Sequence, residues 1–117
     1  MINYSHMKVL LKAVDNESED VGFAAVLHPN ATEAVLLKAM NHPLSNARLR
    51  AAAVNNNNNA TEKILQLGLK DNHYHVRKAV VDNPNTPAHI LKQASNDEER
   101  IIRAIADNRL EQMKKLP

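Results

Sequence analysis

The sequence predicts an all-α fold in which about four helical pairs stack side by side into an α-solenoid. Two sets of similar segments alternate along the 117 residues with a period of about 25–29, the length of one helical pair. A unit of that length is too small to bury its own apolar face and needs neighbours. The chain also has only 2 Gly and 3% aromatic residues, a composition that favours helices joined by short turns over a sandwich or barrel.

The first set of segments predicts one helix of each pair. Each segment starts with Val or Ile followed by Leu, continues amphipathically and reaches Asn or Asp near its end. Three of them follow a threonine that can cap the helix, at Thr32, Thr61 and Thr86, with Glu or Pro next in the chain. The four segments are VLLKAVDN (9–16), VLLKAMNH (35–42), ILQLGLKDN (64–72) and ILKQASND (90–97).

The second set of segments predicts the other helix of each pair. Apolar residues fall at i, i+3 and i+4, and many of them are small, which permits close approach of stacked helices. We expect Ser45 or Asn46 to cap the second of these helices, and Asn96 or Asp97 to cap the fourth. The segments are VGFAAVLHP (21–29), LRAAAVNNN (49–57), VRKAVVDNP (76–84) and IIRAIADNR (101–109).

The repeats predict a single domain over residues 1–117. Its repeats fall at about 6–29, 32–57, 61–84 and 87–109, and a terminal helix at 110–117 caps the stack. Capping matters because an array with an apolar open end tends to self-associate. A first helix near 6–15 either closes the other end or offers a dimer surface, so monomer and homodimer both stay open. The apolar residues of that surface would be Met7, Leu10, Leu11 and Val14.

The run of five asparagines in VNNNNNATEKIL (54–65) aligns with the turns HPN and DNPN between other helices. We therefore interpret it as a turn one or two residues longer than its counterparts, and not as a domain linker. Asn55 or Asn56 should end one helix, residues 57–59 should cross over, and Thr61 should cap the next helix. This interpretation predicts that residues 54–62 are ordered.

A polar residue recurs one step (i+7) along the apolar stripe of the second helices. Because a polar side chain at such a position needs hydrogen-bond partners, we expect a ladder of side chains that bridges adjacent repeats. The other interpretation is four unrelated helix-ending residues, since Asn is common at helix ends. The role is structural in both cases. The positions of this Asn ladder are His28, Asn56, Asn83 and Asn108.

The segment VRKAVVDNPNTPAHIL (76–91) resembles the repeat of the leucine-rich repeat variant family at nearly every fixed position. Residues 49–57 and 101–109 match more loosely, and residues 21–36 keep only the apolar frame and HPN. The resemblance implies a right-handed α-solenoid similar to HEAT and armadillo arrays, without intrinsic catalysis, whose second helix is short or partly 3₁₀. The N-terminal iron–sulfur cluster of some members is not carried over, because this chain has no cysteine.

Composition and motifs exclude several functions. Without cysteine the chain has no disulfide, thiolate nucleophile or zinc–thiolate site. We expect no secretory signal and no membrane span, because residues 1–20 have no basic stretch before a long apolar run and no segment is apolar enough to span a bilayer. We expect a cytoplasmic protein without cofactors. No phosphate-loop or nucleophile-elbow motif occurs, so we expect no enzyme. The pair His73 and His75 has no third ligand nearby in sequence and should point to different sides, so no metal site is expected.

Basic residues of the second helices fall off the apolar stripe and would stack into a ridge. The charge is uneven, with −2 over residues 1–44 and +4 over 45–117. Such a ridge could bind an acidic surface or a phosphate backbone, or it could be an ordinary solvated face with ion pairs along the helix. The residues of this basic ridge are Arg48, Arg50, His75, Arg77, Lys78, Arg100 and Arg103.

Two functions are therefore expected from the sequence. The first is a scaffold that binds a protein partner through its curved surface, by analogy with the fold. The alternative is a weakly selective nucleic-acid binder that uses the basic ridge on phosphates. The scarcity of aromatic residues argues against stacking on bases.

Overall fold

The structure is a computed structural model that describes residues 8–12, 24–41, 46–56 and 59–115. Within these ranges the regular elements are α-helices without any strand, which confirms the all-α prediction. Short helical segments cover residues 8–12 and 24–27. The longer helices are α3 (Glu33–Asn41), α4 (Ala47–Val54), α5 (Glu62–Leu69), α6 (Tyr74–Asp82), α7 (Ala88–Ala94) and α8 (Arg100–Lys114).

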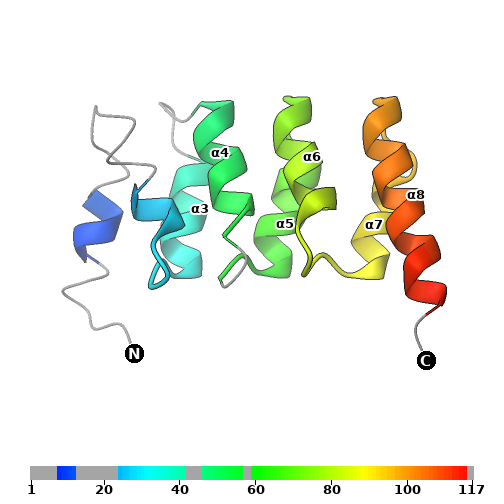
Figure 1. Ribbon diagram of the computed structural model, residues 1–117. Coiled ribbons are helices and arrows are strands. Elements are labelled where there is room, and N and C mark those ends of the chain that lie inside the picture. The colour runs from blue at the N-terminus through cyan, green and yellow to red at the C-terminus, as the bar shows by residue number, and fades with distance from the viewer. Residues whose placement is uncertain (1–7, 13–23, 42–45, 57–58, 116–117) are drawn as a thin grey trace.

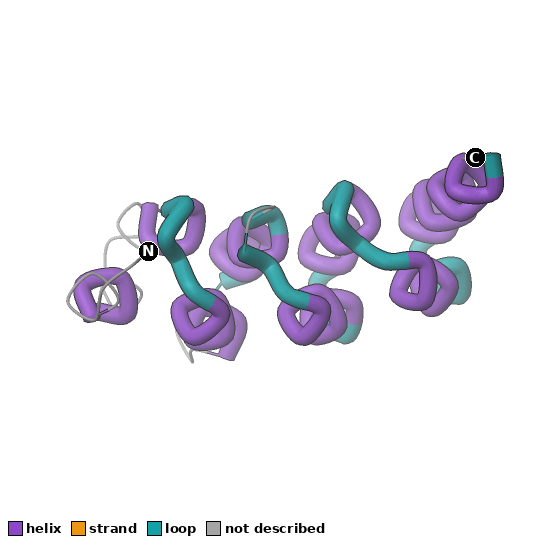
Figure 2. Tube along the Cα trace, turned by 90° about the horizontal axis from the view of Figure 1, so that it is seen from below, coloured by secondary structure: helices purple, strands orange, loops and turns teal. Residues whose placement is uncertain are grey.

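The helices form two layers along the long axis of the molecule (Figures 1 and 2). Helices α3, α5 and α7 form one layer, whereas α4, α6 and α8 form the other together with residues 24–27. Each helix contacts its partner in the other layer and its neighbours within its own layer. The molecule measures 44 × 31 × 18 Å. In Figure 2 the layer of α4, α6 and α8 lies on the concave side of a shallow arc, so we call its exposed surface the inner face.

Side-chain caps start α4 and α5 where the sequence predicts them. The side chain of Asn46 accepts from the amide of Leu49 at 2.8 Å, and Thr61 accepts from Ile64 at 3.4 Å. The expected caps at Thr32 and at Asn96 or Asp97 are wrong, because among the described residues Thr32 Oγ1 has no hydrogen-bond partner and α8 begins after Glu99 without a side-chain cap. The expected cap at Thr86 is wrong, because its hydroxyl donates to the carbonyl of Val80 at 2.6 Å. Helix α7 begins after Pro87 without a side-chain cap, as the fixed φ of proline allows.

The apolar core lies between the two layers and consists of Val, Leu, Ile and Ala. One part extends from Leu10 to Ile90, and a second part lies between α7 and α8. Leu69 packs against both parts, so they are continuous. The largest fully buried side chains include Leu36, Ile64, Leu65, Ile90, Leu91 and Ile102.

The two ends of the chain differ from the prediction. Helix α8 is a single helix of 15 residues, so the separate terminal helix at 110–117 is wrong. Leu110 and Met113 extend α8 and pack against the C-terminal part of the core. At the other end Leu10 is buried and Leu11 packs against the core, so neither is available for the expected dimer surface. The other two residues of that surface, Met7 and Val14, lie outside the described residues.

The second helices are also more regular than the family resemblance implies, because α4 and α6 are α-helical throughout. In α8 the predicted register is off by one residue. Ile102 is fully buried, whereas Ile101 is 48% exposed, so Ile102 is the counterpart of buried Val76. The last repeat therefore has a period of 26 residues at this position, and not 25.

The asparagine run forms the turn between α4 and α5. Asn55 ends α4 and its amide donates to Ala51. Asn56 is buried, and Asn59 donates from Nδ2 to the carbonyl of Pro29 at 2.7 Å. Residues 57–58, which belong to the stretch 54–62 that is predicted to be ordered, lie outside the described residues.

Candidate functional site

Asparagine side chains join consecutive repeats at the edge where the second helices end. Asn56 Nδ2 donates to the carbonyl of Val26 at 2.7 Å and to that of His28 at 3.3 Å. Asn83 Nδ2 donates to the carbonyl of Val54 at 2.8 Å, one repeat further along. Both asparagines are buried, and each satisfies carbonyls left free at the end of the preceding second helix. This geometry is the expected ladder at two of its four positions.

The other two ladder positions are wrong. Asn108 is exposed within α8, because that helix continues to Lys114 and leaves no helix end there. Its place is taken by Arg109, whose Nη1 donates to the carbonyls of Val81 at 2.7 Å and Asn83 at 2.6 Å. At His28 the ring caps its own turn, since Nδ1 accepts from the amide of Asn30 at 3.0 Å.

Arginine side chains join the repeats at the opposite edge. Arg77 Nε donates to Asp97 Oδ2 at 2.9 Å, and its Nη1 donates to the carbonyls of Asp71 and Asn72 at 2.9 and 3.0 Å. The side chains of Arg77 and Asp97 are only 8% and 7% exposed. Arg50 Nε contacts Asp71 Oδ2 at 2.6 Å in the same way. These contacts are joints between repeats.

Arg103 continues this row of arginines. Its Nη1 donates to the carbonyls of Asp97 at 2.7 Å and Glu98 at 2.9 Å, the same pattern that Arg77 makes one repeat earlier. The repeated pattern aligns Arg103 with Arg77, whereas alignment of the segments 76–84 and 101–109 by their first residues places it opposite Lys78. The prediction of one exposed basic ridge is therefore wrong for Arg77, which is buried, and Arg50 and Arg103 are held by the fold.

The remaining ridge residues do not form a row of unpaired cations. Lys78 Nζ lies 2.7 Å from Asp82 Oδ2 on the same helix. His75 and Arg100 are exposed at the starts of α6 and α8. The side chain of Arg48 lies outside what the structure describes. The ridge thus separates into arginines that hold the fold and surface groups, of which His75 and Lys78 line the inner face.

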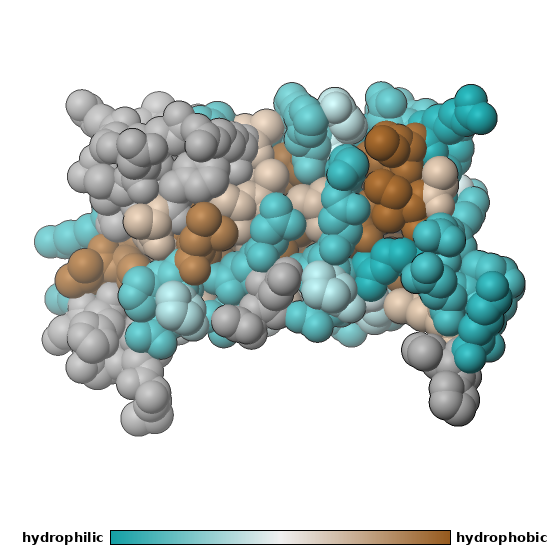
Figure 3. Space-filling model, in the orientation of Figure 1, coloured by the Kyte–Doolittle hydropathy of each residue, from teal (hydrophilic) through white to brown (hydrophobic). Residues whose placement is uncertain are grey.

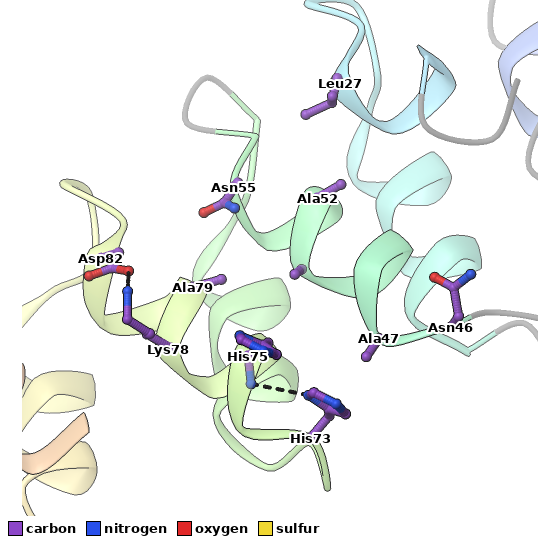
Figure 4. Close-up of a pocket in the computed structure, with 11 residues that line it drawn as sticks. Leu27, Asn46, Ala47, Ala52, Asn55, His73, His75, Lys78, Ala79 and Asp82 are labelled. Carbon is purple, nitrogen blue, oxygen red and sulfur yellow. Dashed lines mark hydrogen bonds and ion pairs between the residues drawn. The ribbon is translucent and has the colours of Figure 1, made fainter. Parts of the chain in front are cut away.

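A groove of about 720 Å³ runs along α4 on the inner face (Figure 4). Its floor is α4 with Ala47, Ala51 and Ala52, joined by Ala79 of α6. Leu27, which is 51% exposed, stands on one side. Polar side chains of α6 and the loop before it form the other side. In Figure 3 this face has pale brown small residues beside more strongly apolar side chains over α8. The polar lining residues are Asn46, Asn55, His73, His75, Lys78 and Asp82.

Three rings gather at one end of the groove. The ring centroids of His73 and His75 are 5.1 Å apart, and the two ring planes make an angle of 18°. The ring centroid of Tyr74 lies 4.1 Å from that of His75. His73 Nδ1 accepts from the amide of His75 at 3.2 Å, which fixes its ring as the cap of α6. The prediction that the two histidines point to different sides is therefore wrong. Within the described residues, no group of three or more metal-ligating side chains converges.

The groove was not predicted as a site, because its floor consists of alanines that the sequence indicated only as helix-contact residues. The available signal was the repeated alanine of ARLRAAAV, which leaves α4 without bulk on its exposed side. The positions Ala51, Lys78 and Ala104 are equivalent on α4, α6 and α8 once the register of α8 is corrected. At the α6 position Lys78 adds bulk, whereas Ala51 of α4 lines the groove together with Leu27 and side chains of α6.

The chain matches no family model, no curated protein and no solved structure. Among the described residues, no helix is long and apolar enough to cross a lipid bilayer.

Proposed function

We propose that this chain is a non-catalytic α-solenoid scaffold that binds a segment of a partner protein in the groove along α4. The carrying observation is the groove itself, an apolar floor of alanines bounded by Leu27 and by polar side chains of α6. Its volume of about 720 Å³ is within the range of roughly 300–1,000 Å³ that is common for ligand clefts. An apolar floor with a polar rim is also the usual composition of an interface.

The solenoid is part of this proposal. It is supported by the two layers of helices and by joints that recur in consecutive repeats. The contact of Asn56 with Val26 is followed by that of Asn83 with Val54, and the pair of Arg50 and Asp71 is followed by that of Arg77 and Asp97. Contacts only between neighbouring units are the characteristic of a solenoid. The resemblance of residues 76–91 to the leucine-rich repeat variant family supports a right-handed superhelix.

Binding to a phosphate backbone is the weaker alternative. Such binding needs several cations that can exchange counterions for phosphates. Arg77 is buried against Asp97, and Arg103 is hydrogen-bonded to two carbonyls of its own loop. Lys78 is paired with Asp82. These contacts favour a protein partner over a nucleic acid.

Catalysis is also disfavoured by the groups that line the groove. The carboxylate of Asp82 is bound to Lys78, and Nδ1 of His73 accepts an amide proton. A general base must instead reach the proton that it abstracts. We therefore assign the groove to binding.

Selection from a random peptide library tests the proposed function. Ala51 is half-buried in the groove floor, and Ala51→Gln should fill the groove while keeping a good helix former. Ala104→Gln is the matched control, because Ala104 is the equivalent exposed position on α8. We expect enriched peptides whose binding is lost with Ala51→Gln and kept with Ala104→Gln. Enrichment of no peptide, or equal loss with both variants, would contradict the proposal, as would tight binding to duplex DNA or RNA at physiological salt.

A further inference from the structure

We infer that the occupant of the groove is an uncharged, extended segment that contains proline, a deduction that rests on the proposed binding function. The first argument is electrostatic. The charged side chains that line the groove are Lys78 and Asp82, which neutralise each other at 2.7 Å. Because these two side chains are already paired with each other, neither offers a free opposite charge to a charged occupant. Such an occupant would also lose hydration on the apolar floor.

The second argument concerns length and depth. The floor is formed by α4, whose 8 residues correspond to about 12 Å of helix axis. An extended polyproline-type segment advances about 3.1 Å per residue, so about four residues cover the floor. Ala47, Ala51 and Ala52 present only methyl groups there, so a segment with small apolar side chains can approach closely.

The third argument concerns hydrogen bonding along the floor. An extended polyproline-type segment makes no internal backbone hydrogen bonds, and its carbonyls need external donors. Asn55 is exposed at the end of α4, and Figure 4 shows its side chain at the groove, where its amide can donate to a carbonyl and accept from an N–H. A helical occupant satisfies its own backbone and would not use this amide.

The fourth argument concerns the ring cluster formed by His73, Tyr74 and His75. Aromatic-lined grooves are the usual receptors of proline-rich segments, because the polyproline conformation costs little entropy to bind. Two of these rings line the groove, and the cap hydrogen bond of His73 holds the cluster in place before a ligand arrives. The chain has 2 Tyr, 1 Phe and no Trp, so this end of the groove concentrates scarce ring surface.

Titration with synthetic nonapeptides tests this inference. The first probe has three Ala-Pro-Pro triplets and neutral ends, the second has Glu in place of each Pro, and the third contains Gly and Ser. We expect only the proline peptide to shift the amide resonances of Ala51, Ala52 and Asn55 saturably in ¹⁵N–¹H spectra. Ala51→Gln and His75→Ala should each weaken binding by about tenfold or more, as for the few interface residues that carry most of the binding energy. Ala104→Gln should leave it unchanged, and thermal melts check that each variant is folded.

The outcomes separate the two proposals. Absence of shifts with the proline peptide, or equal binding of the Glu peptide, overturns the inference about the occupant. If the random library still yields peptides that depend on Ala51, the proposed binding function stands and only the class of occupant was wrong. If those peptides are amphipathic helices, a helix binds there and not a proline segment. If neither the library nor the nonapeptides bind, both proposals fail.

Discussion

Arg77 and Asp97 form a buried ion pair with 2.9 Å between Nε and Oδ2, although 20 residues and the whole of α7 separate them in the chain. The same guanidinium holds the carbonyls of Asp71 and Asn72 in its own loop. Arg77 therefore binds the loop before α6 to the loop before α8. One side chain fixes the relative position of two consecutive repeats.

Loss of this joint should destabilise the fold strongly. Arg77→Ala leaves the Asp97 carboxylate without its main cationic partner in a site where both side chains are under 10% exposed. Removing one partner of a buried pair typically costs about 3–5 kcal/mol. Urea unfolding should show that loss. The double variant Arg77→Ala/Asp97→Asn should lose less stability than the sum of the losses of the two single variants.

Arg100→Ala, at an exposed position, is the control and should change stability by under about 0.5 kcal/mol. A small effect of Arg77→Ala would mean that the repeats are held by the core alone.

The two asparagines Asn83 and Asn108 should differ sharply on substitution. Asn83→Ala leaves the carbonyl of Val54 buried without its side-chain donor, which costs about 1–3 kcal/mol. Asn108 is exposed in mid-helix, so Asn108→Ala should be neutral or slightly stabilising because alanine is the better helix former. Thermal unfolding of both variants checks this prediction. Equal melting temperatures for the two variants would contradict the role of Asn83 in the ladder.

The sequence was sufficient to predict the all-α fold and the alternation of two helix types, because the apolar period is repeated in every unit. It also predicted the inward positions of Asn56 and Asn83, which share a place on the apolar stripe. The prediction failed in α8, where IIRAIADNR allows two registers. Both Ile101 and Ile102 can serve as the buried start, and packing against buried residues of α6 and α7 selects Ile102.

Pairing between distant loops was the other feature that the sequence could not provide. A basic residue off the apolar stripe is normally solvated, so Arg77 was assigned to the surface. Its burial depends on Asp97 in the next repeat, and no local pattern links residues 20 positions apart. For the same reason the groove along α4 was missed, since its depth depends on Leu27 and α6.

Acid should weaken the joint between Arg50 and Asp71. Burial alone would raise the pKa of the Asp71 carboxyl. The hydrogen bonds from Arg50 and from the amide of His73, together with nearby positive charge, lower it by more, so the pKa of Asp71 lies below its ordinary value. A lowered pKa in the folded state stabilises the fold above the unfolded pKa. That contribution is lost as the pH falls through the folded value. We expect wild type to exceed Asp71→Asn in unfolding free energy at pH 7, with a difference that shrinks below about pH 4. A difference independent of pH would contradict this, and Asp107→Asn at an exposed position is the control.

Gly68 lies where α5 packs against both α4 and α6 of the other layer. Its replacement by alanine should destabilise the protein, although alanine has the better helix propensity. A Cβ at this position would lie 2.8 Å from Cγ2 of Val54 and 2.8 Å from Cγ2 of Val80. Both valines are fully buried and stiff at χ1, so they cannot turn away easily. Overpacking costs about 1–3 kcal/mol, whereas the helix gains about 1 kcal/mol from alanine. We expect a net loss of stability in urea unfolding for Gly68→Ala.

Ala104→Gly, at an exposed site of α8, measures the contribution of helix propensity alone. Because Val80→Ala removes one of the two clashing methyl groups, Gly68→Ala should cost less in that background than in wild type. A gain of stability from Gly68→Ala in wild type would show that the helices can separate at this point, and the close packing of α5 between α4 and α6 would then not be needed.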